Sequence, residues 1–405
     1  MGNLESKTTH PIEEKNQFVD FSNTQIAFAH KSDKALHKAA WLFRLMNSRW
    51  LVTLASSLAI MAVRWYLPLA KWLIKITIFE QFVGGETLYD CQDKISELWQ
   101  NRTLTVLDYG AEGRSDEDDL DQARDHFLKA VEFAAAHESV PVVSIKVSAL
   151  SKNSLLESIQ SEMELSHQQI DWRTRMVERV DSICQTGHHY GVKIFIDAEE
   201  TWIQDTIDKL VEQMMEKYNR EKVIVYHTFQ MYRKDRIDYL NRCHQEAQDK
   251  GYLLGAKIVR GAYLEKERDR AEELVYTSPM HETKADTDKD FDAALRFCLD
   301  HYKQIASCAA THNSQSCLYQ AELIGSRGLP KNHHHLNFCQ LYGMSDHITF
   351  NLADAGFNVA KYVVYGEVKE VVPYLTRRAA ENTAVKGEFS REYALIKREL
   401  ERRRV

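Results

Sequence analysis

The chain has 405 residues, of which 44% are apolar and 27% charged, and its formal net charge is -7 at pH 7. This composition is typical of a globular protein with one large domain and appended helices. The negative charge, together with the lack of a basic stripe, a zinc-finger spacing or an RNP-like motif, predicts no binding to nucleic acid. The seven cysteines are scattered without a CxxC pair, which predicts reduced thiols rather than a disulfide framework.

The first hundred residues have a helical pattern, as in DKALHKAAWLFRLMN at 33–47, and GGETL at 84–88 is typical of a turn between helices. The most apolar run, 50–63, is shorter than the roughly 20 residues of a bilayer span. The extreme N-terminus is acidic, unlike a mitochondrial transit peptide. We therefore expect a cytoplasmic protein with an N-terminal helical arm at 1–100. The apolar run and the basic segment 396–404 are candidates for a peripheral contact with the inner face of the membrane, although a solvated last helix is the simpler interpretation of the basic segment.

From residue 101 onwards, short β-rich runs alternate with helical stretches. Each run is a few residues of Val, Ile, Leu or Phe, which is typical of strands buried on both faces of a parallel sheet. Eight such units predict an α/β fold of the (βα)8 TIM-barrel type, distorted by irregular connections, over 101–405 with C-terminal helices. A Rossmann fold is disfavoured because no GxGxxG motif follows an early strand. The runs are 103–109, 141–150, 192–200, 222–232, 253–263, 307–313, 335–344 and 358–366.

Polar side chains gather at the C-terminal ends of these predicted strands, where such barrels carry their active sites. Lys146 and Lys257 are the strongest indication of a functional site, because burying a lysine among apolar residues costs free energy unless an anion pairs with it. Polar ends on all eight strands predict a functional site rather than a structural core. The residues concerned are Asp108, Glu112, Lys146, Asp197, Glu199, Gln230, Lys257, Arg260, His312, Asn313, Gln340 and Tyr362.

Several chemistries compete for this site. Asp197 and Glu199 are a weak candidate for the paired acids of a glycosidase, since such acids usually come from different strands. The three histidines at 333–335 alternate in direction, so we predict a loop entering the seventh strand and no metal site. A lysine-dependent Schiff-base aldolase is the stronger alternative, and it requires a lysine without a strong anionic partner. A barrel without activity that serves as an interaction protein is a third.

An organic cofactor with phosphates and an electron-poor ring would also explain the cations. Gly261 and Ala262 allow close approach of the backbone to a ligand, while Lys257 and Arg260 supply positive charge. Positive charge near a flavin ring favours hydride chemistry because the reduced flavin is anionic. Further polar groups for such a ligand come from the THN motif at 311–313 and from Lys284 in the long fifth connection, which could reach a pyrophosphate.

The motifs KIVRGAY, THN, QLYGM, the Tyr-x-x-x-Gly of YVVYG and RRAAEN, in this order, resemble the proline dehydrogenase family. The resemblance covers roughly residues 80 to 395. It implies a distorted (βα)8 barrel that binds FAD, oxidises L-proline to Δ1-pyrroline-5-carboxylate and passes electrons to a quinone. The implied reaction is direct hydride transfer to the flavin from the proline carbon that bears the nitrogen. The chain resembles the monofunctional members of the family.

The resemblance also implies roles for individual residues. Asp197 and Lys257 correspond to the catalytic residues, Arg377 and Arg378 would bind the substrate carboxylate, and Glu112 would pair with the two arginines as a gate. The implied substrate contacts are Lys146, Tyr263, Tyr362, Arg377, Arg378, Glu112 and Glu381. The implied cofactor contacts are Ala198, Gln230, Lys257, Arg260, Gly261, Ala262, Lys284, Thr311, His312 and Asn313.

Two positions bear on substrate and rate. Many relatives carry Arg where this chain has Lys257; lysine keeps the charge but loses the planar fork. Relatives that prefer hydroxyproline tend to lack a tyrosine at position 362. Tyr362 therefore favours unsubstituted proline, with a hydroxyproline dehydrogenase as the alternative within the family.

The RRAAEN motif is also interpretable from helix geometry. Residues three and four apart share a helix face, so Glu381 lies on the same side as Arg378 and Arg377. The helix follows the eighth strand, so its first turns face the strand ends. We expect the arginine pair to form a fork for a carboxylate, with Glu381 fixing the two side chains.

Overall fold

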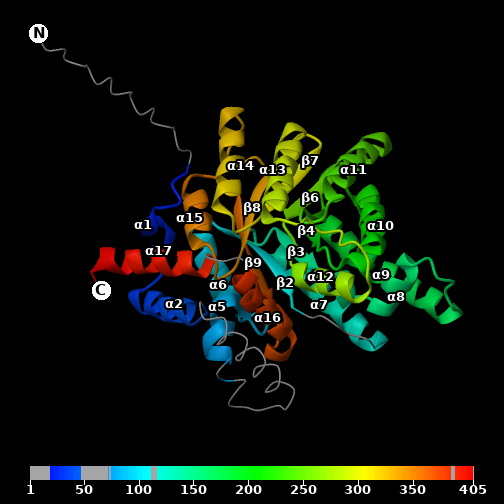
Figure 1. The fold of residues 1–405 in the computed structure, drawn as a ribbon, viewed down its shortest axis with the longest axis horizontal. Coiled ribbons are helices and arrows are strands. Elements are labelled where there is room, and N and C mark those ends of the chain that lie inside the picture. Colours follow the sequence, from blue (N-terminus) through cyan, green and yellow to red (C-terminus); the bar gives the residue numbers. More distant parts are fainter. Residues whose placement is uncertain (1–18, 47–71, 73, 111–115, 385–387, 405) are drawn as a thin grey trace, which may run out of the picture.

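Eight parallel strands form a closed barrel surrounded by helices (Figure 1). The computed structural model describes residues 19–46, 72, 74–110, 116–384 and 388–404. The barrel strands are β2 (Leu104–Tyr109), β3 (Val142–Ile145), β4 (Lys193–Ile196), β5 (Val225–Gln230), β6 (Leu254–Val259), β7 (Ile305–Ala310), β8 (Leu336–Leu341) and β9 (Val359–Tyr365). Consecutive strands pair with each other, and β9 also pairs with β2, which closes the ring. The predicted TIM-type barrel is confirmed.

Each of the eight predicted runs overlaps one of these strands. The bounds differ most at β3, which ends at Ile145 instead of Leu150, while β7 begins at Ile305 instead of Ser307. Ile305 and Ala306 are completely buried and continue the ladder with β6, pairing with Leu254 and Gly255. The histidines at 333–335 precede β8 at Leu336, so they form the expected loop into the seventh predicted strand.

Helices follow every strand and cover the outside of the barrel (Figure 1). They supply the apolar faces that bury the strands from outside, as parallel sheets require. Two helices follow β3, β6 and β9, and one follows each of the others. The helices are α7 (Glu117–Ala135), α8 (Asn153–Gln160), α9 (His167–Tyr190), α10 (Thr201–Tyr218), α11 (Arg236–Lys250), α12 (Leu264–Glu273), α13 (Lys284–Asp300), α14 (Ser314–Ser326), α15 (Asp346–Asp354), α16 (Val368–Ala384) and α17 (Glu388–Arg403).

The segment before residue 101 is mostly helical where it is described. The pattern predicted at 33–47 corresponds to α2 (Asp33–Met46), and the apolar run 50–63 lies outside the described residues. The division of the chain into 1–100 and 101–405 stays a prediction. The other elements here are α1 (Thr24–Ala27), a π-helix (Lys75–Phe79), α5 (Glu80–Phe82), β1 (Val83–Gly85) and α6 (Gln92–Gln100).

β1 corrects one expectation, because Gly84 and Gly85 were expected in a turn and instead form a strand. β1 pairs in parallel with the end of β9, beyond the stretch of β9 that pairs with β8. A Cβ added at Gly84 would lie 2.5 Å from Cγ1 of Val363, so only glycine permits this close approach. The turn begins after the glycines, at residue 86.

The interior of the barrel changes from apolar to polar along several strands. Side chains two residues apart on a strand share a face. On β4 the buried ring of Phe195 is followed on the same face by Asp197, just beyond the end of the strand, and on β5 Tyr226 is followed by Thr228 and Gln230. The apolar layer therefore fills the lower barrel, and the polar layer sits at the C-terminal ends of the strands.

The last helix, α17, packs against α2 on the N-terminal segment (Figure 1). Arg403 donates to Asp33 at 2.8 Å and also to the backbone oxygens of Phe28 and Lys31. The basic end of the chain is thus docked on α1 and α2 through Arg403. Among the described helices, none is both long enough and apolar enough to cross a membrane.

Candidate active site

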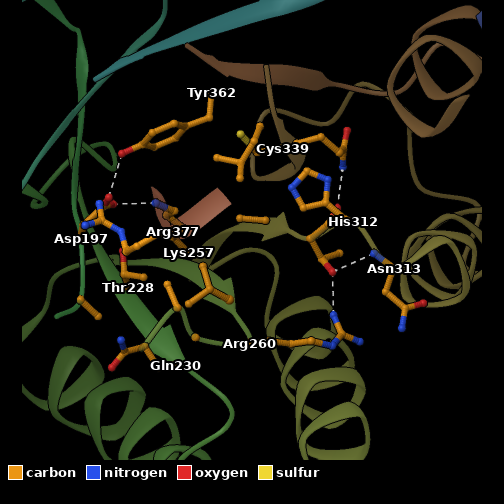
Figure 2. Close-up of a pocket in the computed structure, with 18 of the residues that line it drawn as sticks. Asp197, Thr228, Gln230, Lys257, Arg260, His312, Asn313, Cys339, Tyr362 and Arg377 are labelled. Atoms are coloured by element: carbon orange, nitrogen blue, oxygen red, sulfur yellow. Dashed lines mark hydrogen bonds and ion pairs between the residues drawn. The ribbon is translucent and has the colours of Figure 1, made fainter. Parts of the chain in front are cut away.

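A cavity of about 540 Å³ opens at the C-terminal ends of the barrel strands (Figure 2). Its walls come from β5 to β9, from residues that follow the strands from β3 onwards, and from α13, α14, α16 and α17. In Figure 2 Asp197, Lys257 and Tyr362 lie on one side, and Arg260, His312 and Asn313 lie on the other. The cavity is therefore elongated between a catalytic side, defined by Asp197 and Lys257, and a distal side, defined by Arg260 and Asn313.

Most of the residues singled out from the sequence line this one cavity. Glu112 lies outside the described residues, as does the side chain of Glu381, so the gate and the brace expected of them stay predictions. The residues that the structure brings together are Lys146, Asp197, Ala198, Gln230, Lys257, Arg260, Gly261, Ala262, Tyr263, Lys284, Thr311, His312, Asn313, Tyr362, Arg377 and Arg378.

Asp197 is the centre of the catalytic side. Its Oδ1 accepts from Lys257 Nζ at 2.6 Å and from Ser144 Oγ at 2.9 Å. Its Oδ2 accepts from the Tyr362 hydroxyl at 2.8 Å and lies 3.7 Å from Lys146 Nζ. These partners come from β3, the residue after it, β6 and β9, so one carboxylate fixes side chains from three sides of the barrel.

The electrostatics of this cluster keep Asp197 ionised. Burial alone would raise the pKa of the carboxyl, but the ammonium groups of Lys257 and Lys146 outweigh burial and lower the pKa to about 2. The pKa of the Tyr362 hydroxyl is raised well above its usual value by burial and by the negative charges of Asp108 and Asp197. Tyr362 is consequently a neutral hydrogen-bond donor.

Both strand-end lysines have the anionic partners that burial demands. Lys257 pairs with Asp197, and Lys146 lies 3.1 Å from Asp108 as well as near Asp197. The aldolase interpretation requires a lysine without a strong anionic partner, and both of these lysines have a carboxylate close by. The arrangement does not support the aldolase alternative.

Glu199 has a structural position rather than a catalytic one. It is buried outside the cavity lining, where it accepts the backbone N–H of Ser148 at 3.0 Å and also the hydroxyl of Ser148. Burial raises the pKa of Glu199 to about 7, although the Ser148 hydrogen bonds oppose the rise. Since only Asp197 of the two faces the cavity, the paired-acid glycosidase interpretation is not supported.

The distal side is built around Arg260. Its Nε pairs with Asp288 Oδ1 at 2.7 Å, and its Nη atoms donate to Thr311 Oγ1 at 2.6 Å and to Ser316 Oγ at 2.9 Å. Lys284 Nζ lies 2.6 Å from the other oxygen of Asp288. The chain direction after Arg260 depends on Gly261, whose φ is +130°. A Cβ at this position would lie 2.5 Å from the ring of Tyr232.

His312 is held in place from behind the cavity wall. Its Nδ1 lies 2.8 Å from Ser345 Oγ, and the backbone N–H of Ser345 donates to Glu392 on α17 at 2.6 Å. Burial lowers the pKa of His312 to about 3, and the positive charges of Lys361 and Arg378 act in the same direction. His312 is therefore a neutral imidazole at physiological pH.

Gln230 lines the cavity and has a buried acceptor without a partner among the described residues. Its Nε2 donates to the backbone oxygen of Glu199 at 3.1 Å, whereas Oε1 is buried and has no hydrogen-bond partner in the described part of the chain. A buried polar atom of this kind is expected to find a partner. The N–H of a planar heterocycle such as a flavin would provide one, and the donor-rich distal side would suit phosphates.

The two arginines of RRAAEN reach the cavity from α16. The guanidinium of Arg377 lies 5.9 Å from the ring centre of Tyr263, and that of Arg378 lies 5.3 Å from the ring centre of Tyr374. Arg378 is buried. α16 begins at Val368, three residues after the end of β9, and its residues Tyr374, Arg377 and Arg378 line the cavity.

Thr228, Asp288, Tyr374 and Arg391 are among the lining residues that were not predicted as site residues. Thr228 sits two residues before Gln230 and Tyr374 three residues before Arg377, so strand and helix periodicity could have indicated both. Asp288 sits four residues after Lys284 and was detectable only as its potential helix partner. Arg391 belongs to a different helix from the motif residues, and no local pattern marks it.

A sequence model of the family described as proline dehydrogenase matches residues 91–391. The chain belongs to the proline dehydrogenase family. This confirms the resemblance and the predicted class of enzyme, an oxidoreductase. Within the described residues, no group of three or more His, Cys, Asp or Glu side chains is arranged to hold a metal ion.

The chain is also similar to individual proteins, over most of its length or over part of it. The chain is 35% identical over 324 residues to the carbapenem antibiotics biosynthesis protein CarD of Pectobacterium carotovorum subsp. carotovorum, covering 80% of this chain and 84% of the relative. It is 39% identical over 233 residues to human mitochondrial proline dehydrogenase 1, covering 57% of this chain and 39% of the relative. The chain thus spans well under half of the human protein.

A solved structure supports the fold. Proline utilization A from Bdellovibrio bacteriovorus, inactivated by N-propargylglycine, superposes with a TM-score of 0.74 at 19% identity. The match covers 93% of this chain and 43% of that one. At this identity the likeness establishes the shared barrel of the proline dehydrogenase fold.

Proposed function

We propose that the chain is an FAD-dependent proline dehydrogenase that oxidises L-proline to Δ1-pyrroline-5-carboxylate. The observation that carries the proposal is one cavity that joins the Asp197–Lys257 pair to the Arg377–Arg378 pair and to a cation-rich distal side. The first pair suits hydride chemistry, the second suits a carboxylate, and the distal side suits phosphates. Family membership supports the same reaction.

The residues present fit FAD. Gln230 Oε1 is the orphaned acceptor for a ring N–H, and Arg260 and Lys284 place cations at the distal side, with Thr311–Asn313 as polar neighbours. When bound, FAD supplies the two-electron acceptor for the hydride that leaves the proline carbon next to the nitrogen. Ala198, Gly261 and Ala262 present small side chains, or none, to the same cavity, which leaves room for a flat ring.

The substrate would lie on the catalytic side. Arg377 and Arg378 hold the carboxylate, because two guanidinium groups offer paired N–H donors of matching geometry. Tyr263 and Tyr362 contribute flat apolar surface for the proline ring, and Lys146 lines the floor beside Asp108. The buried Tyr362 ring limits the space around the substrate, which favours proline over hydroxyproline.

Lys257 and Asp197 have different tasks in this proposal. Lys257 places a positive charge where negative charge develops during hydride transfer. Asp197 fixes Lys257 in that position; with a pKa of about 2 it is too weak a base to take the proton from the substrate amine near neutral pH. The amine proton would then leave to solvent.

We also propose that a quinone accepts the electrons. The sequence contains no GxGxxG fingerprint for a nicotinamide nucleotide. A quinone dissolved in a bilayer would bring the enzyme to the inner face of the membrane as a peripheral, cytoplasmic protein. The apolar run 50–63 is the candidate contact.

The proposal is tested by the colour of the purified protein under anaerobic conditions. We expect a yellow protein whose flavin absorbance is bleached by L-proline and restored by a soluble quinone analogue. A colourless protein that takes up no added FAD would contradict the proposal. Borohydride trapping of a carbonyl compound on a lysine would replace it with the aldolase alternative.

A further inference from the structure

The charges that line the cavity are strongly unequal. The lining within the described residues contains seven Lys and Arg side chains and two carboxylates, Asp197 and Asp288. A cleft with such an excess of one sign attracts ligands of the opposite sign. A substrate carboxylate supplies one negative charge at the catalytic side, and the distal side has cations of its own to be balanced.

The three distal cations do not have equal partners. Arg260 and Lys284 share the two oxygens of Asp288, at 2.7 Å and 2.6 Å. In the described part of the chain, Arg391 has one hydrogen bond, from Nη1 to Ser314 Oγ at 3.5 Å, and no carboxylate within ion-pair distance. Arg391 is therefore the distal cation whose charge is not offset within the described chain.

Helix α17 holds Arg391 against the cavity wall. The next residue, Glu392, is buried and accepts the backbone N–H of Ser345, whose hydroxyl contacts His312. At its other end α17 is tied to α1 and α2 through Arg403. These contacts fix the helix on both sides, so the fold brings position 391 to the cavity, where the exposed side chain of Arg391 forms part of the lining.

We infer that Arg391 binds the diphosphate of the cofactor. The inference rests on the proposed function and adds a residue to its site. A guanidinium offers a planar set of N–H donors that matches phosphate oxygens, and the side chain is free to turn from its long Ser314 contact towards a ligand. Arg391 and the Arg260–Asp288–Lys284 cluster would then hold the diphosphate from two sides.

The test compares Arg391→Gln with Arg398→Gln, which removes the same charge from an exposed position of α17 that does not line the cavity. Each apoprotein is titrated with FAD and with riboflavin, which lacks phosphate, and binding is followed by flavin fluorescence. We expect Arg391→Gln to weaken FAD binding about tenfold and to leave riboflavin binding unchanged. Arg391→Lys should retain part of the FAD affinity, and Arg398→Gln should match the wild type.

Equal FAD affinity in Arg391→Gln and Arg398→Gln would overturn the inference. An equal loss for FAD and riboflavin would also overturn it, because that pattern indicates a general distortion of the site. Either result, in a protein that still binds FAD and is bleached by L-proline, leaves the proposed function standing. A wild-type protein that binds no FAD would overturn both.

Discussion

The Nζ of Lys257 and the Oδ1 of Asp197 lie 2.6 Å apart although β5 separates their strands. The pair spans the mouth of the barrel, and the second carboxylate oxygen of Asp197 takes the hydroxyl of Tyr362 from β9. Lys257 thus cannot move without breaking a contact shared by several strands. This rigidity is what electrostatic catalysis requires, since a preplaced charge need not be reorganised during the reaction.

Removal of the Lys257 charge should slow hydride transfer and leave cofactor binding intact. We expect Lys257→Met to lower the rate of anaerobic flavin reduction by about 10²–10³-fold, because a charge aimed at the transition state is lost. Lys257→Arg should retain most of the rate, since the charge remains beside Asp197. The measurement is rapid mixing with saturating L-proline. A wild-type rate in Lys257→Met would remove this residue from the mechanism.

Each arginine of the pair on α16 should contribute mainly to substrate affinity. Loss of one partner of a desolvated charge pair costs about 2–5 kcal/mol. Arg377→Met and Arg378→Met should therefore raise the KM for proline by more than tenfold while the purified proteins remain yellow. Arg398→Met serves as the control on α17. If neither variant on α16 changed KM, the carboxylate would have to bind elsewhere.

The contribution of Asp197 to stability should depend on pH. Its pKa is lowered from 3.8 to about 2 in the folded protein, so the stability it provides is complete above the unfolded pKa and is lost as pH falls towards 2. The shift corresponds to about 2 kcal/mol. Asp197→Asn should lower Tm by a constant amount above about pH 5. The difference should shrink between about pH 4 and pH 2.5.

Differential scanning calorimetry of both proteins across this range provides the check. Taking the difference between the two proteins cancels groups that titrate alike in both. A Tm difference that stayed constant, or grew, as pH fell to about 2.5 would show that Asp197 is not a depressed, ion-paired carboxylate.

Tyr362 should govern selection between proline and its hydroxylated form. Its ring is buried at the cavity wall, its hydroxyl reaches Asp197, and Tyr362→Ser would open the space that the ring fills. We expect the ratio of kcat/KM for hydroxyproline to that for proline to rise about tenfold, the range in which one small group changes selectivity. Tyr362→Phe retains the ring and should leave the ratio unaltered. An unchanged ratio in the serine variant would mean that another residue sets the preference.

The sequence predicted the barrel because each strand is marked locally. Buried runs such as the one around Phe195 end in polar residues such as Asp197, and alternation places both on the inner face. The prediction missed β1, since a three-residue strand with two glycines has no periodic pattern. Gly84 is required by its close approach to Val363, a residue distant in sequence.

The sequence predicted those site residues whose side-chain chemistry or family motif marks them. It missed the residues that only the tertiary fold brings to the cavity. Lys146 and Lys257 implied carboxylate partners, and the structure supplies Asp108 and Asp197. Nothing near Arg391 in the sequence indicates that α17 returns to the cavity. The sequence also could not show that Asp197 and Glu199 lie in different environments, because their spacing suggested a shared face.

The central claim is that one cavity binds a flavin and the carboxylate of proline together. It is tested most directly by anaerobic mixing of the FAD-loaded protein with L-proline and, in parallel, with L-prolinamide, which lacks the carboxylate. We predict that L-proline bleaches the flavin absorbance, and that prolinamide does so only at concentrations more than about tenfold higher, as loss of a charged contact requires. Bleaching by neither compound, or by both at equal concentrations, would contradict the account.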